Sequence, residues 1–147
     1  MRDCLWGVAG FGAGILSFAL TAPILAALHL KSVNTGISSL AHVSLGYRII
    51  IVLTAGTCEE ILFRGYAIER IAELTGSLAS GAVTAWLIFT ISHVFFWGTG
   101  GAIQIGAWAA ITTALYLWRR NLPSCMIMHI LNDGFAFILI PWLFKPG

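Results

Sequence analysis

The chain has 147 residues, of which 10% are charged and 59% are hydrophobic, and its mean hydropathy is +0.90. A soluble domain carries roughly a quarter charged residues, so this composition excludes an ordinary soluble protein and indicates a membrane protein. The net charge is only +2 and the longest basic run is Arg119 and Arg120, so nucleic acid is not an expected partner. Three widely spaced cysteines without CxxC spacing indicate neither a disulfide framework nor a zinc knuckle.

Four stretches of the chain are long and apolar enough to cross a bilayer, which takes about 20 helical residues. They cover residues 5–28, 76–98, 98–118 and 121–144, and Asp133 is the one charged residue among them. The first stretch is too long for the apolar core of a signal peptide and ends in only a weak cleavage site, so we interpret it as a span. Its Gly10 and Gly14 favour close packing against a neighbouring helix. Residues 97–101 form a glycine-rich turn, and Pro123 fits the first turn of the last helix.

A fifth span, residues 46–65, is predicted only if Glu59, Glu60 and Arg64 are accepted inside the membrane. The Ser, Asn and Gly content of residues 31–48 is typical of a loop or an interfacial segment. The helix of the fifth span continues to about residue 74 as an amphipathic tail at the membrane surface, with Gly76 as its carboxyl-terminal cap. The sequence therefore predicts an all-α, multi-pass transmembrane helical bundle of about five spans. It forms one integral-membrane domain over residues 1–147.

The carboxylates and the arginine of the fifth span each need a partner or a function, because a charge at the centre of a span costs roughly 2.5 to 3.5 kcal/mol. Glu60 and Arg64 are four residues apart with the acid first, which favours an ion pair on one helix face. Glu59 is turned by about 100° from Glu60 and has no basic residue three or four positions away. Its partner must therefore come from another helix.

Polar residues on two other predicted spans can meet this unpaired carboxylate. His93 lies near the end of the span 76–98, and His129 lies near the start of the last span, with Asn132 and Asp133 on its face. One acid, two histidines and an amide in a low-dielectric interior are what an acid–base hydrolytic site requires. The sequence thus predicts a hydrolytic site between three helices.

Three motifs in this order match one known family. They are Glu59-Glu60-x-x-x-Arg64, Phe89-x-x-x-His93 and His129-x-x-x-Asp133. The set resembles the motifs EExxxR, FxxxH and His-x-x-x-Asx of the CPBP intramembrane proteases, the CAAX prenyl protease and bacteriocin-processing family, also called Abi. The resemblance covers residues 48–133, and the three motifs together are specific although each alone is weak.

The resemblance implies a glutamate protease of multi-pass helical fold that uses no metal and no cofactor. Glu59 would activate the attacking water with help from His93, while His129 and the Asx position would stabilise the oxyanion. Glu60 and Arg64 would complete the site or hold its geometry, and a purely structural ion pair is an equally good interpretation of these two residues.

Asp133 departs from the commoner asparagine at the Asx position, because an aspartate donates a hydrogen bond only when it is protonated. In one interpretation, Asn132 supplies the amide donor from one residue earlier. In the other, Asp133 orients His129, as a carboxylate does in other hydrolases. We favour Asn132 as the donor.

The expected partners are the lipid bilayer and a peptide or protein presented at the membrane, and the expected location is a bacterial or archaeal cell membrane. Prenylated CAAX proteins, bacteriocin precursors and carboxy-terminal sorting tails all remain possible substrates. Two other function classes stay open. A zinc hydrolase could use Glu59, His93 and His129 as ligands, although no HExxH helix supports it. A non-catalytic immunity protein, scaffold or proton-coupled carrier could keep the same buried residues.

Overall fold

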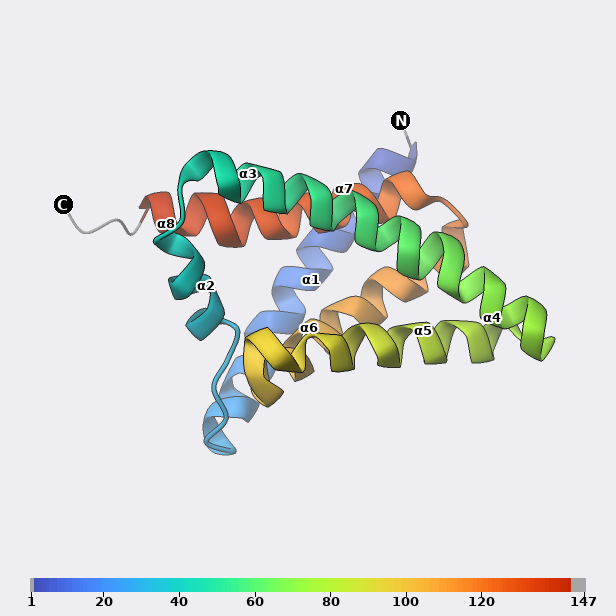
Figure 1. Cartoon of the computed structure of the whole chain (residues 1–147), viewed down its shortest axis with the longest axis horizontal. Helices are drawn as coiled ribbons and strands as arrows, with labels where there is room; N and C mark the ends of the chain where they lie inside the picture. Colours follow the sequence, from blue (N-terminus) through green and yellow to red (C-terminus); the bar gives the residue numbers. More distant parts are fainter. Residues whose placement is uncertain (1, 144–147) are drawn as a thin grey trace.

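The computed structural model describes residues 2–143, which are almost entirely helical and contain no strand (Figure 1). The elements in chain order are α1 (Arg2–Ala27), α2 (Asn34–Ala41), α3 (Leu45–Thr54), the π-helix η1 (Ala55–Ala67), α4 (Ile68–Thr75), α5 (Leu78–Ser92), α6 (Val94–Arg119), α7 (Leu122–Gly134), the π-helix η2 (Phe135–Leu139) and α8 (Ile140–Leu143). This confirms the predicted all-α class.

The helices pack as a bundle in which α6 is the most buried long helix. In Figure 1, α3, η1 and α4 follow one another without a break, and α7, η2 and α8 run beside α3 and η1. Helix α5 packs on α4 and η1, while α1 packs on both α6 and α7. The element η1, which carries the first motif, therefore contacts both α5 and α7, where the other two motifs begin.

Three helical segments in the described part of the chain are long and apolar enough to cross a membrane: Arg2–Ala27, Val94–Arg119 and Leu122–Leu143. Helix α5 is apolar but has only 15 residues. Large apolar side chains such as Leu16, Leu20 and Ile24 are exposed on the outside of the bundle, where lipid can cover them. The chain is an integral membrane protein, and the number of five spans stays a prediction.

The helix ends follow the local signals in the sequence. Gly76 closes α4 in the left-handed conformation, with φ of 69°. The side chain of Asn121 accepts a hydrogen bond from the Ser124 backbone nitrogen (3.0 Å) and caps α7, with Pro123 in the first turn as expected.

Two connections are more helical than their composition indicated. Residues 31–48, predicted as a loop or an interfacial segment, contain the short helix α2, which is not long enough to span a membrane. The bend expected over residues 97–101 is present at Gly98, whose φ of 69° suits glycine. However, α5 ends earlier, at Ser92, and α6 begins at Val94. His93 therefore lies at the junction of two helices.

Glycines bring the backbones of the bundle into close contact. A Cβ atom on Gly56 would lie 2.4 Å from a side-chain carbon of Ile130 and 3.1 Å from its backbone nitrogen, so only glycine lets η1 approach α7 this closely. In α1, Gly10 and Gly14 pack against Met128 and Trp108, as the sequence predicted. The Gly56 contact places residue 129 of α7 directly beside η1.

Candidate active site

A cavity of about 570 Å³ lies between the helices that carry the three motifs. Its walls include five of the residues predicted from the sequence: Glu59, His93, His129, Asn132 and Asp133. Most of its other lining residues are aromatic or aliphatic. The volume is that of an ordinary small-molecule or peptide pocket. The remaining two predicted residues, Glu60 and Arg64, are buried and do not line it.

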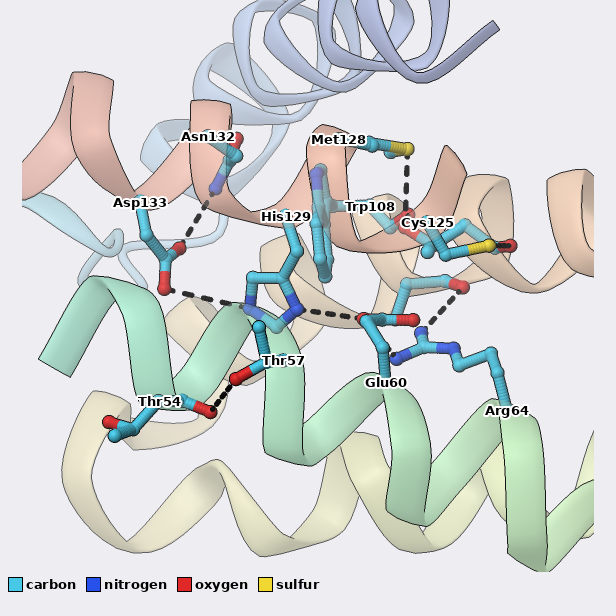
Figure 2. Close-up of polar contacts among 12 residues, drawn as sticks. Thr54, Thr57, Glu60, Arg64, Trp108, Cys125, Met128, His129, Asn132 and Asp133 are labelled. Carbon is cyan, nitrogen blue, oxygen red and sulfur yellow. Dashed lines mark hydrogen bonds and ion pairs between the residues drawn. The ribbon is translucent and has the colours of Figure 1, made fainter. Parts of the chain in front are cut away.

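Glu60 is the centre of a buried network that also contains Arg64 and His129 (Figure 2). Its Oε1 atom accepts hydrogen bonds from Arg64 Nη1 at 2.9 Å and from His129 Nδ1 at 2.7 Å. The side chains of Glu60 and Arg64 are 0% and 1% exposed. The predicted ion pair is therefore present, and it extends to a histidine on another helix.

Arg64 is further held by groups of two other helices. Its Nη2 atom donates to the backbone oxygen of Ala109 at 3.3 Å, and its guanidinium carbon lies 4.7 Å from the ring centroid of Phe89. A cation over an aromatic face is attracted by the ring's quadrupole. These contacts hold the buried arginine in place, and they join η1 to α5 and α6.

His129 lies between two carboxylates. Its Nδ1 faces Glu60, and its Nε2 is 3.5 Å from Asp133 Oδ2 (Figure 2). The 2.7 Å contact with Glu60 is a hydrogen bond, whereas the 3.5 Å contact with Asp133 is a longer one. The Trp108 ring packs edge-on against the His129 ring, with centroids 4.7 Å apart. His129 is thus fixed as a hydrogen-bond donor to Glu60, with its other ring nitrogen directed toward Asp133.

His93 has the opposite arrangement. Its Nδ1 is 2.7 Å from the backbone oxygen of Phe89, and its ring packs at 4.4 Å from the Phe89 ring. Since a carbonyl oxygen can only accept, Nδ1 carries the proton in this contact, and Nε2 of a neutral ring keeps its lone pair. His93 can therefore accept a proton from a group in the cavity.

Glu59 lines the cavity and makes no hydrogen bond to any of residues 2–143. It lies within electrostatic range of His129, His93 and Asp133. The sequence predicted that a histidine from another helix would face this carboxylate. The structure brings both histidines near it, but the direct hydrogen bond of His129 goes to Glu60.

Asn132 and Asp133 both belong to α7 and both lie at the cavity. The Asn132 amide nitrogen is 3.4 Å from Asp133 Oδ1. Both His129 and Asn132 therefore direct donors at the same aspartate. This arrangement is compatible with either of the two interpretations of the third motif.

Sequence reasoning missed Trp108, which fixes the ring of His129, and Gln104, which lines the cavity. Gln104 accepts from the Val33 backbone nitrogen at 2.9 Å and so ties the segment before α2 to α6. A signal for Trp108 was present, because it lies in the middle of a predicted span whereas interfacial tryptophans lie near span ends. No three His, Cys, Asp or Glu side chains within residues 2–143 are placed to hold one metal ion.

Comparison with known proteins gives one match. Residues 41–135, more than half of the chain, match the family described as type II CAAX prenyl endopeptidase Rce1-like. No curated protein and no solved structure matches the chain. The matched range includes all three motifs and the five predicted site residues that line the cavity. The chain therefore belongs to the Rce1-like family of type II CAAX prenyl endopeptidases, which lies within the CPBP family.

Proposed function

We propose that the protein is a glutamate-dependent intramembrane endopeptidase that cleaves a peptide near its carboxyl terminus, without a metal or another cofactor. One observation carries the proposal. Glu59, which has no hydrogen-bond partner within the described residues, and His93, whose Nε2 is left basic, line the same cavity as His129, which is held by Glu60. A base and an oxyanion donor on facing walls are what hydrolysis of an amide requires.

In the proposed reaction, Glu59 and His93 take a proton from a water molecule whose oxygen attacks the scissile carbonyl carbon. The carbonyl oxygen becomes an oxyanion, which receives hydrogen bonds from His129 Nε2 and the Asn132 amide. Collapse of this intermediate breaks the C–N bond. The proton held by the base passes to the leaving amine, and the products are a new carboxylate and a new amino terminus.

Glu60 and Arg64 have a positioning role in this proposal. Glu60 holds Nδ1 of His129, and so directs Nε2 of the ring toward the cavity side, where Asp133 lies. The ion pair with Arg64 neutralises the charge of Glu60. Without the arginine, a buried charge would remain uncompensated, at a cost of about 3 to 5 kcal/mol.

The proposed substrate is a membrane-bound peptide of the CAAX type, because the family is described by that activity and the cavity is lined mainly by apolar side chains. The test is cleavage of a prenylated CAAX peptide by the purified protein in lipid vesicles, with the products identified by mass spectrometry. Glu59→Gln and His93→Ala are each expected to reduce the rate at least about 100-fold without lowering thermal stability. Glu73→Gln, at an exposed carboxylate outside the cavity, is the matched control.

Three outcomes would contradict this function. Wild-type rates in the Glu59 and His93 variants would remove the proposed base. Loss of activity in a chelator, with recovery on adding zinc, would favour the metal hydrolase in its place. An inactive wild-type protein with every class of peptide named above would favour the non-catalytic alternative.

A further inference from the structure

Arg48 differs from the other partly or fully buried arginines of the described chain. Arg64 and Arg119 each pair with a carboxylate. Arg48 has no acidic partner within residues 2–143. Its Nη1 donates to the backbone oxygen of Phe137 at 2.8 Å, and its Nε is enclosed without an acceptor, as is the Nε of Arg119. What distinguishes Arg48 is that no carboxylate of the described residues balances its charge, so this guanidinium is suited to an anionic partner that the chain does not supply.

The position of Arg48 relates it to the cavity. Phe137, which Arg48 contacts, lines the cavity, as do Ile51, Ala55 and Glu59. Residues 48, 51, 55 and 59 recur at intervals of three and four and so share one side of the α3–η1 segment. At about 1.5 Å per residue, Arg48 lies about 16 Å along this segment from Glu59. Arg48 is not itself a lining residue of the cavity, but it adjoins the lining residue Phe137 at the end opposite to the proposed base.

The cavity wall between these two ends is apolar. It includes Ile51 and Ala55 of the α3–η1 segment, Ile37 and Leu40 of α2, and Ile140 of α8. Three extended residues span about 10 Å, and the long arginine side chain covers most of the remaining distance. A short aliphatic peptide tail therefore fits between Glu59 and Arg48, with its end near the guanidinium.

We propose that Arg48 binds the carboxyl-terminal carboxylate of the substrate and so places the scissile bond a fixed number of residues before the chain end. This inference rests on the proposed function. A guanidinium binds a planar carboxylate with parallel hydrogen bonds, and the terminal carboxylate is the one charge that every aliphatic tail carries. The side chains of the released residues lie along the apolar wall.

The test uses two prenylated CAAX peptides that are identical except that one ends in a free carboxylate and the other in a carboxamide. With the wild-type protein, kcat/KM is expected to be at least about tenfold higher for the free acid, mainly through KM. Arg48→Met should bring this ratio close to one, and Arg48→Lys should keep part of it. Arg70→Met removes an arginine outside the cavity and should leave the ratio unchanged.

Tail length provides a second measurement. Two additional residues move the carboxylate by about 7 Å, so peptides lengthened in this way should lose the preference for the free acid. Equal kcat/KM for the acid and the amide in the wild type would overturn the inference while leaving the protease function intact. A ratio that persists in Arg48→Met would overturn it as well.

Binding separates this inference from the protease function. Peptide affinity is measured with Glu59→Gln, which is not expected to turn over substrate. If the wild type cleaves neither peptide but both proteins bind the acid more tightly than the amide, the carboxylate site stands and the protease function fails. Equal binding of acid and amide overturns the carboxylate site. Because the acid and the amide peptide are also compared in the wild-type protein, the test still gives an answer if Arg48→Met does not fold.

Discussion

Two charged clusters of the protein have similar contact distances in very different surroundings. In the buried network, Glu60 contacts Arg64 at 2.9 Å and His129 at 2.7 Å, with Glu60 and Arg64 0% and 1% exposed. In a second cluster, which we name the surface cluster, Glu69 contacts Arg120 at 2.7 Å and Tyr116 at 2.9 Å. There, Arg120 and Glu69 are 44% and 35% exposed. The number and length of contacts therefore do not distinguish the two clusters.

Their surroundings determine what each cluster contributes. At the surface, water solvates each partner when the other is removed, and exposed ion pairs contribute about 0 to 1 kcal/mol. In the buried network no water replaces a lost partner, so removing one side leaves an uncompensated charge. Loss of one partner from the buried network should therefore strongly destabilise the fold. Substitutions in the surface cluster should change stability only slightly.

The largest expected effect is that of Arg64→Ala. Removing the arginine should lower the free energy of unfolding by about 3 to 5 kcal/mol, because Glu60 stays buried without its counter-charge. The measurement is thermal or denaturant unfolding in detergent, together with the yield of membrane-inserted protein. The double variant Glu60→Gln with Arg64→Gln should fold better than either single variant. A stable but inactive Arg64→Ala would instead assign the arginine a direct role toward substrate.

The next largest effect, on the cleavage rate, is expected from Asn132 and Asp133, which lie next to His129 at the cavity. If Asn132 donates to the oxyanion, Asn132→Ala should lose about 2.7 to 4 kcal/mol of transition-state stabilisation. Asp133→Asn should then be neutral or mildly beneficial, because it removes a negative charge beside the developing one. Cleavage rates normalised to folded protein provide the measurement.

The opposite pattern would support the other interpretation of the third motif. If Asp133 orients His129, Asp133→Asn should impair turnover severely, because an amide can hold the ring in the wrong tautomer. Asn132→Ala should then change little. Rates close to the wild type in both variants would remove both residues from the mechanism.

The smallest effect is expected in the surface cluster. Burial acts to raise the pKa of Glu69, but hydrogen bonds from Arg120 and Tyr116 outweigh it and lower this pKa below its usual value. The contribution of a carboxylate with a lowered pKa is present above the unfolded pKa and is lost as the pH falls through the folded pKa. Glu69→Gln should therefore cost at most about 1 kcal/mol at neutral pH. Unfolding at a series of acidic pH values should show the difference from wild type disappearing, and a constant difference would contradict this origin.

The sequence predicted the helix ends well, because these depend on neighbouring residues alone. Gly76 adopts the left-handed conformation and Pro123 lies in the first turn of α7. The bend at Gly98 was also predicted, but the end of α5 at Ser92 was not. The sequence also gave no sign that residues 55–67 form a π-helix. Apolar periodicity does not reveal such i→i+5 bonding, although π-helical turns are frequent at functional sites.

Because charged side chains are costly in a membrane, the sequence predicted that the site residues lie together. It did not predict which of them form hydrogen bonds with one another. The Glu60–Arg64 contact follows from four-residue spacing on one helix. Which glutamate meets His129 depends instead on how α7 is rotated against η1. That rotation is set by the contact of Gly56 with Ile130, and it places His129 on Glu60. A contact of this kind between distant segments has no local sequence signal.

The buried network has a consequence for how the protein is made. Glu60 and Arg64 pair within one helix, but their other partners come late in the chain: Ala109 lies 45 residues after Arg64, and His129 lies 69 residues after Glu60. While only the first half has been synthesised, these contacts are missing, and a charge at the centre of a span opposes transfer into lipid by roughly 2.5 to 3.5 kcal/mol. The span of residues 46–65 is therefore expected to integrate into the bilayer only after α7 has left the ribosome. Nascent chains arrested at increasing lengths, each carrying a reporter of membrane integration, should show this segment integrating poorly until residue 129 has emerged.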